Sequence, residues 1–165
     1  MPKIIENLPQ RLLDEARAQC EELGYSAMTI RSVAKSCGVG VGTVYNYYPS
    51  KDALIAAVVM VDWMECMEPT LAQHENLETA LRTGYDGLRR FISRNEKIFR
   101  DEGAVLLFSG SGSHYHNLVC RELETLVRPF CPDDFTARFM AEAMATWVVE
   151  GVDFETLCPV LLRLV

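Results

Sequence analysis

The sequence predicts an all-α fold, in which a small N-terminal module of three helices precedes a larger C-terminal helical domain. Apolar residues recur at every third or fourth position through most of the chain, which is the period of a helix, whereas alternating strand patterns are rare. Glycine, proline and capping residues stand where these stretches begin and end. The 165 residues, 49% of them hydrophobic, suffice to bury the core of such a protein.

The first helix is predicted at residues 7–23. Asn7 suits an N-cap and Pro9 suits the first turn, while Gly24 ends the stretch. The inward positions recur at every fourth residue and are Leu8, Leu12, Ala16 and Cys20.

Two shorter helices follow, separated by a glycine turn. Thr29 is expected to cap the second helix, because its hydroxyl can accept from N–H groups of the next turn. Gly38 closes that helix in the left-handed conformation that other residues resist. The third helix begins near Val41 and ends before Pro49, whose ring disfavours helical geometry at the preceding residue.

The fourth helix is predicted from Lys51 to about Glu68, with Ser50 as its cap. Its buried stripe is expected at Leu54, Val58, Val61 and Met64. The predicted organisation is therefore an N-terminal domain at 1–49, a connecting helix at 50–68 and a C-terminal domain at 69–165.

The C-terminal domain keeps the helical spacing to the end of the chain. Its longest stripe starts after Asp133 or Asp134 as cap and comprises Phe135, Phe139, Met140, Ala143, Met144, Trp147, Val148 and Gly151. Residues 154–165 are almost wholly apolar, and Pro159 is expected to mark the start of their regular helix.

Acidic residues are distributed unevenly along the chain. The net charge of −7 arises entirely after residue 60, because residues 1–60 hold six basic and six acidic side chains. No Asp or Glu occurs from Ser26 to Lys51, although 23 of the 165 residues are acidic. Since duplex DNA rewards positive charge and disfavours carboxylates, this stretch suits a nucleic-acid surface even though the whole chain is acidic.

Residues 29–48 have the parts of a DNA-reading helix-turn-helix: a supporting helix, a tight glycine turn and a second helix that can enter a major groove. The inner face is expected at Val33, Ala34, Val39, Val44 and Tyr48. The outward positions are expected to be Val41, Gly42, Thr43, Asn46 and Tyr47. Inside a helix Gly42 costs about 1 kcal/mol relative to Ala, which indicates that DNA must approach closely there.

The run from Thr29 to Leu54 resembles the signature of the TetR family. In that pattern a Thr-initiated helix is followed by Gly-Val, a small residue, Gly-Thr, an apolar residue, a tyrosine, an aromatic or His pair and Lys-x-x-Leu. The resemblance covers about residues 8–66, and beyond them only the helical character is shared. Many relatives carry Ser, and often Lys or Gln, where this chain has Gly40 and Val41, which implies poorer direct readout and more reliance on DNA shape.

The resemblance implies a TetR-type transcriptional regulator, most simply a repressor released from a palindromic operator in double-stranded DNA by a small-molecule effector; the sequence leaves an activator open. Arg31 would reach guanine and Asn46 adenine, while Thr29, Tyr47 and Lys51 would hold phosphates. The implied DNA-binding residues are Thr29, Arg31, Val41, Gly42, Thr43, Tyr45, Asn46, Tyr47 and Lys51.

The resemblance also implies that the C-terminal domain binds a ligand and forms a homodimer. The apolar stripes near the C-terminus exceed what one chain of this size can cover, so the interface is expected at Phe135, Phe139, Met140, Met144, Trp147, Leu157, Leu161 and Leu164. An apolar effector pocket would be lined by Trp63, Met67, Tyr85, Phe91, Phe99, Phe108 and Tyr115. The alternative is a DNA-bound adaptor whose C-terminal domain binds a protein partner.

Other classes of protein receive little support. No nucleophile elbow, phosphate loop or zinc-protease motif occurs, so an enzyme is not expected. The six cysteines form no Cys-x-x-Cys pair, which indicates reduced core residues, with a redox-sensing thiol as the alternative. No cofactor or metal is expected; His114 and His116 stand in a loop-like context, with a metal or anion site as the alternative. Without an apolar membrane span or a secretory leader, the chain is expected in the cytoplasm.

Overall fold

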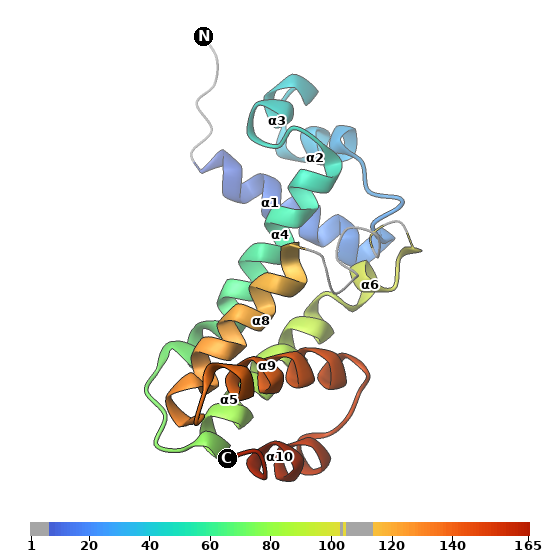
Figure 1. The fold of residues 1–165 in the computed structure, drawn as a ribbon. Coiled ribbons are helices and arrows are strands. Elements are labelled where there is room, and N and C mark those ends of the chain that lie inside the picture. The colour runs from blue at the N-terminus through green and yellow to red at the C-terminus, as the bar shows by residue number, and fades with distance from the viewer. Residues whose placement is uncertain (1–6, 103, 105–113) are drawn as a thin grey trace. The chain divides into compact units, whose positions relative to one another are not determined.

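A computed structural model describes residues 7–102, 104 and 114–165 (Figure 1). Every regular element among these residues is helical, which confirms the predicted all-α fold. The elements are α1 (Leu8–Leu23), α2 (Ile30–Cys37), α3 (Val41–Tyr47), α4 (Lys51–Met67), η1 (Glu68–Leu71), α5 (Leu77–Arg94), α6 (Glu96–Phe99), α8 (His114–Val127), η2 (Arg128–Phe130), α9 (Asp134–Val149) and α10 (Phe154–Leu162). Among the described helices, none combines the length and the apolar run that crossing a lipid bilayer requires.

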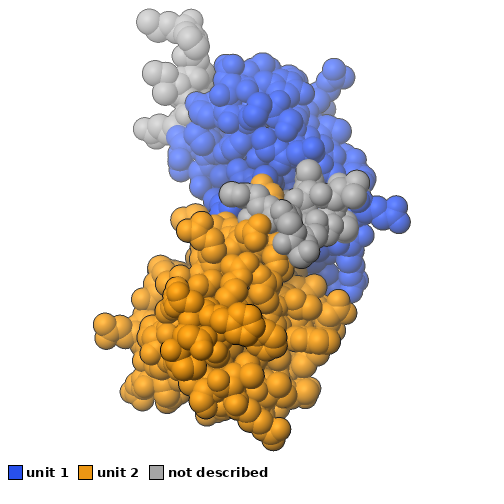
Figure 2. Space-filling model, in the orientation of Figure 1, with its two compact units in different colours: residues 1–62, 95–107 blue, residues 63–94, 108–165 orange. Residues whose placement is uncertain are grey.

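The chain divides into two compact units (Figure 2). Unit 1 comprises residues 1–62 and 95–107, and unit 2 comprises residues 63–94 and 108–165. The division falls within α4, so this helix contributes residues to both units. The three segments expected from the sequence, with boundaries after residues 49 and 68, stay a prediction.

Unit 1 has its core among α1, α2, α3 and the first part of α4. The four predicted inward positions of α1 are all buried. Asn7 does not cap this helix as predicted, since its side chain makes no capping bond. Its backbone is left-handed, with φ 55°, whereas a capping residue needs an extended backbone to direct its side chain at the first turn.

Polar contacts fasten two further segments of unit 1 to the three-helix module. Nη2 of Arg17 on α1 lies 2.7 Å from a carboxylate oxygen of Asp62 on α4, which is 1% exposed. The Asp101 carboxylate accepts from the backbone N–H and the hydroxyl of Ser26, at 2.8 and 2.7 Å. The second contact fastens Asp101, which is distant in sequence, to unit 1.

The buried face of α4 differs from the predicted stripe. Leu54 and Val58 are buried as expected, but Val61 is half-exposed and Met64 is 64% exposed. Ten residues of helix turn by about 1000°, so Met64 lies roughly 80° away from Leu54 around the axis. The residues actually buried are Leu54, Ile55, Val58, Val59, Asp62, Trp63, Cys66 and Met67.

Unit 2 is a layered packing of four helices. α8 and α9 lie side by side, and α5 packs against both of them and against α10 (Figure 1). The inward face of α9 is lined with alanine and methionine, and that of α5 includes two glycines, Gly84 and Gly87. Small residues at helix crossings allow the backbones to approach closely.

Aspartate caps begin α9 and α10. The Asp133 carboxylate accepts from the N–H of Thr136 and that of Asp153 accepts from the N–H of Thr156, each at 2.7 Å. These hydrogen bonds lower the pKa of both carboxyl groups. Of the two caps considered for α9, the structure selects Asp133.

Pro159 does not start α10 as predicted. The helix begins at Phe154, directly after its Asp153 cap, and Pro159 lies inside it. Because proline has no N–H, the carbonyl of Glu155 lacks its helical donor. Glu155 and Pro159 are both exposed, so water can take the place of that donor.

The substitution Gly87→Ala is expected to destabilise the protein by about 1–3 kcal/mol, the usual cost of overpacking. A Cβ at Gly87 would lie 2.7 Å from Sδ of Met67 and 3.1 Å from the backbone oxygen of Cys66, and a backbone carbonyl cannot rotate away. Urea unfolding monitored by circular dichroism measures the change.

The matched control is Gly84→Ala on the same helix. Its Cβ would lie 2.9 Å from Cδ2 of Leu126 and from Cε of Met144, which are the ends of flexible side chains that can move. We therefore expect a smaller loss than for Gly87→Ala, and equal or reversed losses would contradict this account of the packing.

Candidate nucleic-acid interface

α2 begins at a capping box, which confirms the predicted Thr29 cap. The Thr29 hydroxyl accepts from the backbone N–H of Ser32 at 3.0 Å, and the Ser32 hydroxyl accepts from the backbone N–H of Thr29 at 3.2 Å. The Ser32 hydroxyl also donates to the buried side chain of Gln19 on α1, at 2.5 Å. The start of the supporting helix is thereby tied to α1.

The turn between α2 and α3 closes at Gly38, whose φ of 70° is left-handed as predicted. The N–H of Gly38 donates to the carbonyl of Lys35 at 3.1 Å, and the N–H of Val39 donates to that of Ala34 at 3.0 Å. α3 then follows its N-cap residue Gly40, whose carbonyl accepts from the N–H of Thr43 at 2.9 Å. A tight turn with left-handed glycine is what a helix-turn-helix requires.

α3 has one buried residue, Val44, and its other side chains lie outward to different degrees. Gly42, Tyr45, Asn46 and Tyr47 are exposed, and Val41 and Thr43 are half-exposed. The exposed fraction is 50% for Tyr45 and 48% for Tyr47, which is high for aromatic residues in a folded module. The helix therefore presents a continuous polar and aromatic surface.

Two residues beside α3 are held by contacts within the protein. The hydroxyl of Tyr48 lies 3.5 Å from the carbonyl oxygen of Pro9, and burial raises the pKa of Tyr48. The ammonium of Lys51 donates to the carbonyl of Ser26 at 3.3 Å and lies 4.2 Å from the centre of the Tyr25 ring. Lys51, expected as a phosphate ligand, is thus half-buried and already hydrogen-bonded.

Known proteins share this module. Residues 12–58, from α1 into α4, match the family model described as bacterial regulatory proteins of the tetR family. Residues 12–58 thus form an N-terminal module of the TetR family. Members of this family are regulators rather than enzymes, in agreement with the sequence-based expectation.

Curated relatives of this chain align mainly over the same module. The HTH-type transcriptional regulator UidR of Escherichia coli is 36% identical over 52 residues, 32% of this chain and 26% of UidR. The regulator YhgD of Bacillus subtilis is 35% identical over 101 residues, 57% of this chain and 52% of YhgD. The repressor KstR of Rhodococcus jostii is 40% identical over 50 residues, 30% of this chain and 24% of KstR. The matched part is thus about a quarter of UidR and KstR and about half of YhgD.

Solved structures share the fold over nearly the whole chain. A TetR-family regulator from Streptomyces coelicolor superposes with a TM-score of 0.57 at 20% identity, covering 95% of this chain and 99% of that one. A TetR-like regulator from Rhodococcus sp. RHA1 gives a TM-score of 0.52 at 19% identity, covering 92% and 90%. The helical C-terminal region is therefore of the TetR type in fold.

Three residues of the predicted effector pocket pack inside unit 2 of the TetR fold. Trp63, Met67 and Phe91 are buried, and the Trp63 and Phe91 rings meet edge to face with their centres 5.1 Å apart. The Trp63 indole N–H donates to the Glu122 carboxylate at 2.7 Å. Burial raises the pKa of Glu122 and this hydrogen bond partly opposes the rise. Core packing thus accounts for these three side chains.

Three of the other four predicted pocket residues, Tyr85, Phe99 and Tyr115, lie within the described part of the chain. The Tyr85 hydroxyl donates to the Val152 carbonyl at 3.1 Å. Tyr115 is half-buried near the start of α8, and Phe99 belongs to unit 1. Phe108 lies outside the described residues. The aromatic set expected at a pocket is therefore divided between the units.

The predicted dimer residues divide into a buried and an exposed group. Four are buried within their own chain, which corrects their assignment to an intersubunit surface: Met140, Met144, Leu157 and Leu161. Four keep a free surface: Phe135 (78% exposed), Phe139 (51%), Trp147 (51%) and Leu164 (39%). The stripe predicted from the sequence combined residues from two faces of α9, because apolar residues lie on both faces.

Unit 2 contains a cluster of three polar side chains, His116, Cys120 and Glu142, that the sequence analysis did not predict. His116 is in α8 and not in a loop as predicted, and its Nε2 lies 2.8 Å from Oε2 of Glu142 on α9. Sγ of Cys120 lies 3.4 Å from His116 Nε2 and 3.3 Å from the same Glu142 oxygen. Burial and the hydrogen bond to Glu142 raise the pKa of Cys120 to about 12. The thiol is therefore protonated, which disfavours the redox-sensing alternative at this cysteine.

The sequence contained part of the signal for this cluster. His116 and Cys120 are four residues apart, which places both on one face of a helix. A Cys-x-x-Cys pattern does not include such a pair. Glu142 comes from another helix, and no local pattern could have joined it to the pair.

The substitution Gly42→Ala is expected to stabilise the free protein, by up to about 1 kcal/mol, because alanine favours the helix. No atom of the described chain lies within 4 Å of a Cβ built at Gly42, so the methyl group meets no obstacle. Thermal and urea unfolding in the absence of DNA measure the effect.

Gly38→Ala is the control for Gly42→Ala. It also enters open space in the described structure, but at a φ of 70° a side chain is strained, by about 1–2 kcal/mol. The two substitutions should therefore change stability in opposite directions. A destabilising Gly42→Ala would mean that this glycine serves the fold of the module.

Proposed function

We propose that the chain is a DNA-binding transcriptional regulator whose α3 lies in the major groove of an operator. The observation that supports this best is the outward surface of α3, where Gly42, Thr43, Asn46 and Tyr47 are available to a partner. A protein-only explanation for Gly42 is lacking, since no described atom contacts its position. The absence of acidic residues from Ser26 to Lys51 removes a source of repulsion by phosphates.

Roles for individual residues follow from their chemistry. The exposed Arg31 guanidinium suits the O6 and N7 acceptors of guanine, and the exposed Asn46 amide suits adenine. Val41 or Tyr45 would touch a thymine methyl, and Thr43 would approach a base edge. Thr29 and Tyr47 would position the module by phosphate contacts. Lys51 would also contact a phosphate, but its ammonium must then weaken its hydrogen bond to the Ser26 carbonyl.

We further propose that the protein acts as a homodimer on a palindromic operator. The exposed stripe of Phe135, Phe139 and Trp147 on α9 is apolar surface of the kind that a second subunit covers. A two-fold dimer would place two copies of α3 about 34–36 Å apart, in successive major grooves. Operators would then be palindromic, because each half-site meets the same surface.

We also propose that a small-molecule effector releases the protein from its operator. The protein would act in the cytoplasm, where the bacterial chromosome lies. A ligand that binds unit 2 better in a DNA-incompetent state would shift the population away from DNA, and DNA would weaken ligand binding by the same factor. Because three of the seven side chains expected at a pocket, Trp63, Met67 and Phe91, pack as core, the adaptor alternative stays open. A thermal-shift screen distinguishes the two, since only a sensor gains stability from a small molecule.

Selection of bound sequences from random duplex DNA should yield a palindrome bound in a salt-sensitive manner. Arg31→Ala should weaken operator binding by about 1–3 kcal/mol and relax preference at one base pair. Tyr47→Phe should weaken all sites alike, because a phosphate contact carries no sequence information. Fluorescence anisotropy over a range of salt concentrations measures these effects.

Arg121→Ala is the matched control, because it removes the same charge from an exposed position on α8, in unit 2. It should leave DNA binding unchanged. Gly42→Ala should weaken operator binding even where it stabilises the free protein. Equal affinities for Arg31→Ala and Arg121→Ala, or no binding to any duplex, would refute the proposed function.

Trp147→Glu should convert the dimer to a monomer without unfolding unit 2, because Trp147 is 51% exposed in the single chain and a buried carboxylate at an interface is costly. Leu71→Glu is the control, since Leu71 is an 85% exposed apolar residue on η1, outside the α9 stripe. Sedimentation velocity measures the mass. A dimer that survives Trp147→Glu places the interface elsewhere.

A further inference from the structure

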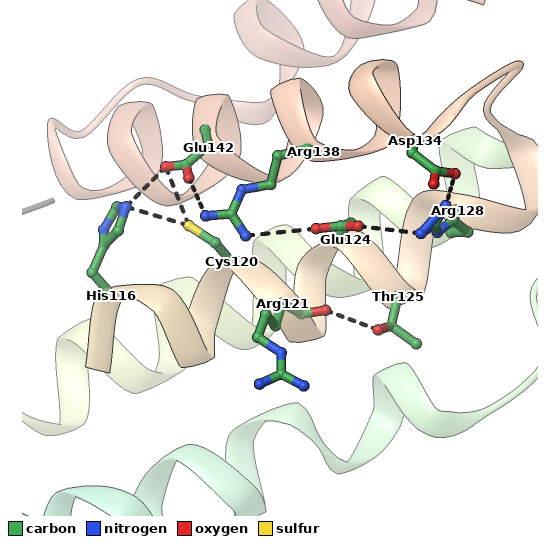
Figure 3. A network of polar contacts seen from close by, with 9 residues as sticks. All are labelled: His116, Cys120, Arg121, Glu124, Thr125, Arg128, Asp134, Arg138 and Glu142. Carbon is green, nitrogen blue, oxygen red and sulfur yellow. Dashed lines mark hydrogen bonds and ion pairs between the residues drawn. The ribbon is translucent and has the colours of Figure 1, made fainter. Parts of the chain in front are cut away.

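We propose that His116, Cys120 and Glu142 form a binding site for a divalent transition-metal ion, with zinc as the ion best suited to it. Their ligand atoms, one nitrogen, one sulfur and one oxygen, all lie within 4.8 Å of one another. Figure 3 shows the three side chains converging from two helices, α8 and α9. This site goes beyond the proposed DNA-binding function and does not depend on it.

The spacing of the three atoms is close to that of a metal site. With zinc bonds of about 2.0–2.1 Å to nitrogen and oxygen and 2.3 Å to sulfur, tetrahedral geometry separates nitrogen from oxygen by about 3.3 Å and sulfur from either by about 3.6 Å. The structure has 2.8 Å between His116 and Glu142, 3.4 Å between Cys120 and His116, and 3.3 Å between Cys120 and Glu142. An opening of a few tenths of an ångström therefore admits the ion.

The donor set selects the type of metal. A thiolate and an imidazole are poor ligands for Mg²⁺ and Ca²⁺, which prefer oxygen, and a carboxylate is a poor ligand for Cu(I). The mixture of nitrogen, sulfur and oxygen matches the ligands that zinc takes in proteins. Among the described residues these three supply the ligand atoms, and water can take a fourth position.

The site is accessible from solvent on one side. Cys120 is completely buried and forms its floor. The side chains of His116 and Glu142 are 22% and 38% exposed, so an ion can enter between them.

A chain of ion pairs holds the Glu142 carboxylate in place (Figure 3). Arg138 donates to Oε1 of Glu142 at 2.6 Å, which leaves Oε2 directed at His116 and Cys120. Nη1 of Arg138 also lies 3.6 Å from the Glu124 carboxylate, so the guanidinium charge is shared with a second acid. Outer contacts that orient a metal ligand in this way strengthen metal binding.

The charges balance when an ion binds. The thiol proton of Cys120 leaves to solvent, and the proton with which His116 Nε2 donates to Glu142 also leaves, the imidazole taking the neutral form that carries its proton on Nδ1. The Nε2 lone pair then faces the ion, and the hydrogen bonds to Glu142 are exchanged for metal bonds. The thiolate of Cys120 and the carboxylate of Glu142 then neutralise the two positive charges of the ion. Arg138 is neutralised by Glu124, so no uncompensated cation stands beside the metal.

The test uses the full chain, treated with a chelator and then titrated with Co²⁺ and Zn²⁺. One Co²⁺ per chain should bind and produce the near-ultraviolet absorption of a thiolate–cobalt bond, and Zn²⁺ should displace it. Excess Mg²⁺ should have no effect, because it does not accept a thiolate ligand. No DNA is present, so failure here leaves the DNA-binding proposal untouched.

Substitutions test which side chains bind the metal ion. Cys120→Ser should abolish the thiolate–cobalt band. His116→Gln and Glu142→Gln should each weaken Zn²⁺ binding by at least about tenfold. Tenfold is the smallest loss usual for mutating a residue that merely orients a metal ligand, and these two residues are ligands themselves. Matched controls are Cys131→Ser, a half-exposed cysteine outside the cluster, and His74→Gln near η1. Both controls should bind like the parent chain.

Circular dichroism establishes that each variant is folded. If Cys120→Ser does not fold because the residue is buried, His116→Gln decides, since it changes a partly exposed side chain. Absence of stoichiometric Co²⁺ or Zn²⁺ binding overturns the proposal and leaves the cluster a hydrogen-bonded contact between α8 and α9. A cobalt band that survives Cys120→Ser, or an equal loss in Cys131→Ser, overturns it too.

Discussion

The left-handed turn at Gly38 is the constraint on which the reading surface depends. By ending α2 in this conformation, it starts α3 at an angle that buries Val44. With Val44 fixed inward, the helical period leaves Gly42, Asn46 and Tyr47 on the outside. The capping box at Thr29 holds the other end of α2, so the supporting helix is defined at both termini.

α9 shows how one helix can serve two surfaces. Its inward face consists of Ala137, Met140, Ala141, Met144, Ala145 and Val148, and small residues let it pack closely with its neighbours. The bulky apolar residues Phe135, Phe139 and Trp147 remain outside. The core of unit 2 thus forms within one chain, while apolar surface is retained for the association that we propose.

The cluster of His116, Cys120 and Glu142 illustrates how polar groups at a helix–helix contact can be stable without a ligand. Each of the three side chains finds a hydrogen-bond partner in the other two, so their polar groups are satisfied at this contact. The same proximity that satisfies them gives the donor atoms nearly the separation that a small cation needs. Hydrogen bonding and metal binding are therefore alternative uses of one arrangement.

The sequence alone determined the helices of the N-terminal module, its Thr29 cap, its Gly38 turn and the inward position of Val44, because these depend on local backbone preferences and on helical period. It could not assign the faces of α9, since apolar residues occur on more than one face of that helix. Only the packing of neighbouring helices decides which of these residues are buried. The metal-ligand cluster was likewise decided by tertiary structure. Glu142 meets His116 and Cys120 through the packing of α8 on α9, and a contact between residues distant in the chain has no periodic signature in sequence.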